Sequence, residues 1–260
     1  MTRLARTARL LALGWLFYVK MATRSAFDGL LGILYPLFFA TVAFFMFRAG
    51  HDSKSLLYAS LGAAVMGVWS STSTTAGSAM QRERWHGTLE LLVAAPRHFA
   101  LVLLPASVAQ TTIGLYSMLA TLFWGRVLFG IGVSIEHPLL FAVSVLATVL
   151  AIGSAGFLLA VSFVRYRAAW ALGNMLEYPV WLVCGFLVPL SLFPHWVRPI
   201  SWVLAPTWGM QAIRESALGG SPLADAAVCL LLGAAYVLAG VLVVERVLGA
   251  ARRRAALSLA

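Results

Sequence analysis

Long apolar stretches separated by short polar ones dominate the hydropathy pattern of the chain. A transmembrane helix needs about 20 mostly apolar residues, and six stretches reach that length. They cover residues 27–47, 55–79, 99–125, 138–164, 168–190 and 223–244. Because the runs are continuous and do not alternate over short segments, they predict helices and not a β-barrel. The expected fold is an all-α polytopic membrane protein with six transmembrane helices, forming a single transmembrane domain over residues 1–260.

Two segments outside these runs predict further helices. In residues 1–26, the basic side chains fall within one arc of a helix, and the opposite face is apolar, with Leu4, Leu11, Trp15, Tyr18 and Val19. Leu10, Leu13, Phe17 and Met21 interrupt the basic side. The pattern predicts an imperfectly amphipathic helix on the membrane surface, either a structural anchor or a contact for a partner. Residues 193–220 are too polar and proline-rich to span, yet they carry tryptophans, which favour the water–lipid boundary. They predict two short external, re-entrant helices broken near Pro206; the alternative is an ordinary outer loop with a tryptophan belt.

Composition excludes a soluble domain. Of the 260 residues, 61% are hydrophobic and 11% are charged, against about 45–50% and about 25% in ordinary soluble proteins. The mean hydropathy is +0.89. Cys184 and Cys229 both lie in apolar runs, which excludes a disulfide framework.

The distribution of positive charge predicts the orientation. Of the 19 Lys and Arg residues, 14 flank the side that holds both termini and the second and fourth loops, and five flank the other side. The positive-inside rule therefore predicts that both termini are cytoplasmic. The same asymmetry accounts for most of the net charge of +10, so no nucleic-acid partner is expected.

Polar side chains lie inside two of the predicted spans, where burying them is costly. Glu177 is near the middle of the fifth span, so it must face a protein interior or a water-filled path. It is either a polar point on a transport path or a structural carboxylate bonded to Asn174 or to another helix. Six consecutive hydroxyl residues end the second span, and many could bond to their own backbone carbonyls. The candidates for the transport path are Ser70, Ser71, Thr72, Ser73, Thr74, Thr75, Asn174, Glu177 and Trp181.

Motifs for bound nucleotide, metal or catalysis are missing from this sequence. There is no Gly-x4-Gly-Lys-Ser/Thr phosphate loop, and neither of the two lysines, Lys20 and Lys54, follows a glycine. No His-Glu-x-x-His or Gly-x-Ser-x-Gly pattern occurs, and the five histidines are scattered singly. We therefore expect no cofactor or metal in this chain and no enzymatic activity of its own.

The loop after the second predicted span combines charged residues, a glycine and a leucine-rich turn. Gly87 predicts a turn before a helix that Thr88 caps, with Glu90 in its first turn, where the helix dipole favours it. Pro96 ends that helix before the third span. Residues 81–96 resemble the signature cytoplasmic segment of the ABC type-2 permease family, although Trp85 and His86 stand where charged residues are more usual. The matching residues are Glu83, Arg84, Gly87, Thr88, Leu89, Glu90, Leu91, Leu92 and Pro96.

A second match lies in the external segment. The triplets that begin at Pro194 and Pro206, each ending in tryptophan, and the tetrapeptide Gln211-Ala-Ile-Arg214 are similar to the external helices that precede the family's last span. With six spans and an amphipathic N-terminal helix, the resemblance covers essentially the whole chain.

The resemblance implies a membrane subunit of an ATP-driven exporter. Members work as a permease dimer, with a second copy or a homologous permease, and with two separate ABC ATPase subunits that bind ATP and Mg. Residues 81–96 would be the coupling helix that docks on the ATPase, and the second and fifth spans would line the path. The expected location is a bacterial inner or plasma membrane, with membrane lipids as further partners.

The residues do not identify one substrate. A small hydrophobic drug or a lipid is expected, because the path is largely apolar; a lipid-linked polysaccharide is the alternative. From another class, an ATP-independent secondary transporter or channel predicts internal repeats and more ionisable residues within the membrane. A membrane-embedded enzyme would need a catalytic constellation. A neighbouring gene for an ATPase, or co-purification of that ATPase, would discriminate between these classes.

Overall fold

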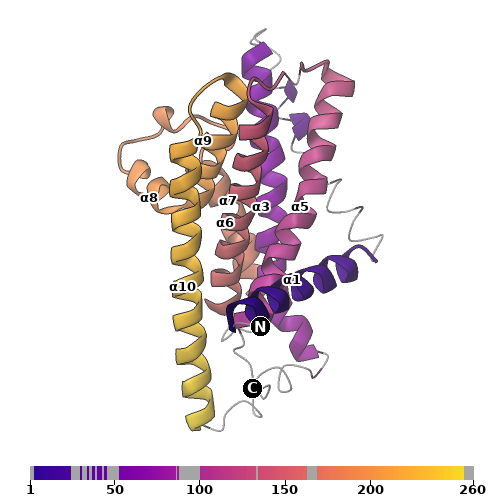
Figure 1. Cartoon of the computed structure of the whole chain (residues 1–260). Helices are drawn as coiled ribbons and strands as arrows, with labels where there is room; N and C mark the ends of the chain where they lie inside the picture. Colours follow the sequence, from indigo (N-terminus) through magenta and orange to yellow (C-terminus); the bar gives the residue numbers. More distant parts are fainter. Residues whose placement is uncertain are drawn as a thin grey trace.

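The computed structural model in Figure 1 describes residues 3–24, scattered positions between 30 and 45, and residues 53–85, 87, 100–132, 134–162 and 169–254. Every regular element in these parts of the chain is a helix. The helices are α1 (Arg3–Ala22), α3 (Ser53–Trp85), α5 (Ala100–Phe129), α6 (Pro138–Ser162), α7 (Ala169–Val183), the 3-10 helix η2 (Leu190–Leu192), α8 (Val197–Val203), α9 (Ala205–Leu218) and α10 (Leu223–Arg254). The all-helical prediction is thus confirmed for the described residues.

Helix α3 lies at the centre of the bundle. It packs on α5, α6 and α7, and every residue from Ala59 to Ser70 is buried. Its 33 residues give a length of about 50 Å, well beyond the ~30 Å of a bilayer core. The helix therefore continues past the predicted span 55–79 to Trp85. Gly87 follows with φ of 66°, a left-handed conformation that commonly ends helices.

Close helix contacts depend on small residues, as between α6 and α10. Ala147, Ala151 and Ala155 of α6 are buried. A Cβ on Gly233 of α10 would lie 3.0 Å from the Cα of Ala151. Small side chains at this crossing therefore let the two backbones approach closely, as in many membrane helix pairs.

Helix α1 crosses one end of the bundle and packs on α5 (Figure 1). Trp15 Nε1 donates a hydrogen bond to Thr112 Oγ1 at 3.1 Å, and Gly14 lies against Pro105. Tyr18 and Val19 share this half-buried face. The prediction of a helix within residues 1–26 is confirmed, and its apolar face is the one that meets α5.

Three helices of the described residues are long and apolar enough to cross a membrane: α5, α6 and residues Leu223–Arg246 of α10. They correspond to the third, fourth and sixth predicted spans. The first predicted span, 27–47, lies largely outside the described residues. Helix α3 occupies the second span, but its hydroxyl run makes it less apolar. The six-span count is thus met only in part.

The fifth span requires a correction. The prediction was a helix over residues 168–190, but α7 ends at Val183 after 15 residues, or about 22 Å. Gly185 takes φ of 71°, and the Phe186 and Gly185 amides bond back to the carbonyls of Trp181 and Leu182 at 3.1 and 3.0 Å. This is the glycine-ended closure of a helix known as the Schellman motif. Residues after it are apolar but not helical until η2.

Residues 193–220 form two helices, as predicted, in the half of the bundle away from α1 (Figure 1). Helices α8 and α9 are separated at Leu204, close to the predicted break near Pro206, which is the second residue of α9. A proline is tolerated there because the first amides of a helix have no intrahelical partner. Tyr236 of α10 stabilises the break: its hydroxyl donates to Val203 O at 2.6 Å and accepts from the Ala205 amide at 3.1 Å.

Candidate functional site: two polar contacts between the central helices

Ser70 and Glu177 meet between α3 and α7. The Ser70 hydroxyl donates a hydrogen bond to Glu177 Oε1, and Glu177 is only 3% exposed. Both residues were predicted to belong to a transport path. The carboxyl partner in the structure is therefore a hydroxyl of another helix, while Asn174, one turn earlier on α7, is half-buried.

Most of the hydroxyl run on α3 bonds to its own helix. Ser71 and Thr72 donate to Val68 O at 2.9 Å, and Ser73 and Thr74 donate to Ser70 O at 3.3 and 2.8 Å. Such bonds satisfy hydroxyls within an apolar interior. The side chain of Thr75 lies outside the described residues.

Thr72 also joins α3 to α5, because its Oγ1 lies 2.9 Å from Thr111 Oγ1. At the same crossing, Gly156 of α6 faces the Thr72 methyl group, where a Cβ would collide with it. Thr72, within the hydroxyl run, is thus a point at which α3, α5 and α6 pack together.

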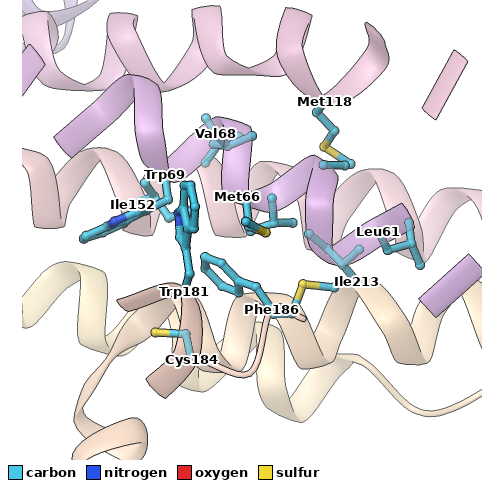
Figure 2. Packing of buried hydrophobic residues seen from close by; sticks show 14 of the residues in the cluster. Leu61, Met66, Val68, Trp69, Met118, Ile152, Trp181, Cys184, Phe186 and Ile213 are labelled. Carbon is cyan, nitrogen blue, oxygen red and sulfur yellow. The ribbon is translucent and has the colours of Figure 1, made fainter. Parts of the chain in front are cut away.

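Large apolar side chains follow or precede the two residues of this contact along α3 and the α7 segment. Trp69, Trp181 and Phe186 belong to one buried cluster, in which they gather between α3 and the end of α7 (Figure 2). The Trp181 ring meets Tyr178 edge-on, with centroids 5.1 Å apart. Trp181, a predicted path residue, is thus 5% exposed and lies one helical turn beyond Glu177.

A buried arginine makes a second contact between these elements; the sequence placed Arg214 in a family-like tetrapeptide but did not predict it as a site residue. Arg214 of α9 donates from Nη1 to Tyr58 Oη and to Gly185 O, each at 2.7 Å, and from Nη2 to Phe186 O at 2.5 Å. Its Cζ lies 3.4 Å from the centroid of the Tyr58 ring. We call Arg214 with Tyr58, Gly185 and Phe186 the Arg214 clamp.

The chemistry of the α7 terminus explains why a cation binds there. The last carbonyls of a helix lack intrahelical donors and carry the negative end of its dipole. Ser201 Oγ donates to one of these carbonyls, Val183 O, at 2.6 Å, and Arg214 donates just past the helix end, to the Gly185 and Phe186 carbonyls. Burial lowers the pKa of Arg214 from its ordinary value to about 10, so its guanidinium stays protonated at neutral pH.

A glycine on α3 makes room for the clamp. A Cβ on Gly62 would overlap the Phe186 carbonyl and lie 3.0 Å from Arg214 Nη2. Helix periodicity carried a signal for this site: Met210, Ile213, Arg214 and Ala217 follow the spacing of one buried helix face. A single cation on an otherwise apolar stripe needs buried acceptors.

The predicted coupling segment is only partly within the described residues. Glu83 and Arg84 lie in the last turn of α3, with their side chains outside the described set, and Gly87 makes the predicted turn. Beyond it, Thr88, Leu89, Glu90, Leu91, Leu92 and Pro96 lie outside the described residues. Across the part of the chain that the structure describes, no three His, Cys, Asp or Glu side chains are grouped to hold a metal ion.

A helical bundle with long apolar helices defines an integral, multi-pass membrane protein. The ABC-2 type transporter family model matches residues 9–218. The chain therefore belongs to the ABC-2 type transporter family, as a permease subunit without the ATPase domain. No curated protein matches the chain significantly. By family, permeases of this kind pair with ABC ATPase subunits and typically bind no cofactor themselves.

Proposed function

We propose that this permease subunit exports a hydrophobic or amphiphilic molecule, a drug-like compound or a lipid, across a bacterial plasma membrane. ABC ATPase subunits energise it by docking on residues 81–96. Both termini are cytoplasmic, on the same side as that segment. The observation that carries the proposal is the family match together with the architecture of α3, which extends about 50 Å from Ser53 to Trp85.

Helix α3 supports a coupling role because it joins two ends of the molecule. One end leads through the Gly87 turn into residues 88–96, and its buried middle contacts α5, α6 and α7. α3 is one continuous helix. A movement of the residues that follow Trp85 would therefore be transmitted along it to the packed centre of the bundle.

The proposed path runs beside α3 and α7. The Ser70–Glu177 contact supplies a polar point in a setting of tryptophan and other apolar side chains. Such a setting suits an apolar substrate with one polar group better than a polysaccharide, which requires many hydrogen-bond partners. Export of a lipid-linked polysaccharide remains the alternative.

A second permease copy, or a similar chain, would complete the path. Helix α7 packs mainly on α3 and exposes Met175, Tyr178 and Leu182 on its other face. We propose that this face of α7 meets the partner permease, in keeping with the dimeric arrangement that the family resemblance implies.

The test is reconstitution of the full-length permease with the ABC ATPase that co-purifies with it. We expect native mass spectrometry to show two permease and two ATPase chains. Inverted membrane vesicles should accumulate a lipophilic dye such as Hoechst 33342, or a fluorescent phospholipid, only when ATP is added. A stable permease monomer that binds no ATPase would contradict the proposal.

A further inference from the structure

The Arg214 clamp joins three elements that are distant in the sequence. Arg214 belongs to α9, Tyr58 to the first turns of α3, and Gly185 and Phe186 follow α7. At its other end, α3 leads into residues 81–96. One continuous helix thus reaches both the clamp and the proposed ATPase contact.

The clamp links α9 to α3 through the hydrogen bond from Arg214 to Tyr58. Helix α9 packs chiefly on α6 and α10, and it touches α3 over a small area. Without the clamp, α9 would keep its packing on α6 and α10 while losing its hydrogen bonds to Tyr58 and to the end of α7.

Stability alone is a poor reason for burying this charge. The acceptors of Arg214 are neutral, and its buried Nε has no hydrogen-bond partner among the described residues. Burying a charge carries a desolvation cost that neutral acceptors offset poorly, and the best-attested use of buried charged or polar groups is to fix register or to operate a switch.

We propose that Arg214 is a positioning residue for transport, which holds α9 on the α3–α7 pair so that a displacement of α3 reaches the external helices. This inference rests on the proposed function, because it needs the ATPase to move α3 through residues 81–96. The planar guanidinium suits the task, since it donates to two successive carbonyls and stacks on Tyr58 at once.

The experiment uses the full permease–ATPase complex in proteoliposomes. Both native cysteines are replaced (Cys184→Ala and Cys229→Ala), and Gln211→Cys places a thiol at an exposed position of α9. Its reaction rate with a maleimide is compared between the nucleotide-free and the vanadate-trapped complex. The clamp variants are Arg214→Met, Arg214→Lys and Tyr58→Phe. The matched control is Arg198→Met, at a half-buried arginine of α8.

In the parent complex, we expect vanadate trapping to change the maleimide reaction rate. Arg214→Met should keep ATPase association and hydrolysis. The difference in maleimide reaction rate between its nucleotide-free and vanadate-trapped complexes should become roughly tenfold smaller, the scale expected for losing a hydrogen bond to a charged group. For Arg214→Lys and Tyr58→Phe, this rate difference should be reduced in part, and Arg198→Met should show the rate difference of the parent. A residue needed only for folding would instead lower yield and hydrolysis together.

The inference is overturned if Arg214→Met shows the full change of the parent. It is also overturned if all three clamp variants fail to assemble while Arg198→Met assembles, because Arg214 would then serve folding. A parent complex that hydrolyses ATP without any change at position 211 overturns the inference alone. A parent permease that binds no ATPase contradicts the proposed function itself.

Discussion

Ser70 of α3 donates a hydrogen bond to the carboxyl group of Glu177 on α7, across 107 positions of sequence. Tyr58 and Arg214 form a second polar contact 12 residues earlier on α3, which corresponds to about 18 Å along the helix. Between the two levels, α3 buries apolar side chains that include Leu61, Val65 and Val68. α3 is therefore joined to α7 directly by the Ser70–Glu177 contact. Nearer its first turns, α3 is joined through Arg214 to Gly185 and Phe186, which follow α7.

Removing the Ser70 hydroxyl should destabilise the protein. We expect Ser70→Ala to lower the free energy of unfolding by about 1.5–3 kcal/mol, because a buried carboxyl group loses its donor. Thermal melting of the detergent-purified permease measures the effect. The matched control is Ser73→Ala, whose buried hydroxyl bonds to its own helix at 3.3 Å. Equal melting temperatures for the two variants would show that the Ser70–Glu177 contact adds no stability.

Glu177→Gln separates a transport role from a structural one. The glutamine carbonyl oxygen can still accept the Ser70 hydrogen bond, so expression and melting temperature should stay close to the parent values. We expect substrate-stimulated ATPase activity of the complex to change, because the carboxyl group is the polar point that we propose for the path. A large loss of yield with normal specific activity would instead assign Glu177 a structural role.

Gly62→Ala should strain the Arg214 clamp without touching its arginine. A Cβ at Gly62 meets the Phe186 carbonyl, and overpacking of this kind costs about 1–3 kcal/mol, although alanine favours a helix by about 1 kcal/mol. We therefore predict a lower melting temperature. Gly132→Ala is the control, because nothing lies within 4 Å of a Cβ at that position. A Gly62→Ala variant more stable than the parent would contradict the described geometry.

The proposed dimer contact can be tested by cross-linking. In a background with Cys184→Ala and Cys229→Ala, Met175→Cys should form a permease–permease cross-link in membranes, since Met175 is 72% exposed on the outer face of α7. Leu119→Cys on α5 is the control, with a similar exposure of 64%. Cross-linking by Leu119→Cys and not by Met175→Cys would shift the interface to α5.

Hydropathy predicted where helices lie better than where they end. It reports the apolar part of a helix, so α3 and α10 run on to Trp85 and Arg254, where the residues are polar but still helical. At α7 the opposite error arose: residues 184–190 are apolar, but Gly185 in a left-handed conformation ends the helix. A backbone conformation of this kind is invisible to an average over side chains.

The sequence predicts those residues of the candidate site that are polar within an apolar run. Glu177 and the hydroxyl run stood out for that reason, although their pairing through Ser70 depends on how α3 and α7 pack. Arg214 was counted as a flanking charge and as the end of the Gln211–Arg214 match, but not as a site residue. Its role comes from the carbonyls of Gly185 and Phe186, and main-chain acceptors have no signature in side-chain patterns.

The central claim is that ATPase subunits energise this permease through residues 81–96, and one measurement tests it most directly. Export by inverted vesicles is recorded beside pull-down of the ATPase for Glu90→Lys and for the double variant Leu91→Asp/Leu92→Asp. Glu90→Lys removes a helix-dipole benefit of about 0.3–1 kcal/mol and reverses a charge at the proposed contact, while the double variant destroys its apolar face.

We expect both proteins to insert in the membrane and to keep the melting temperature of the parent, because the proposal assigns these residues to the ATPase contact. ATPase recovery should fall about tenfold or more, and export should be lost with it. Normal export by both variants, with normal recovery of the ATPase, would contradict the assignment of residues 81–96 as the coupling segment.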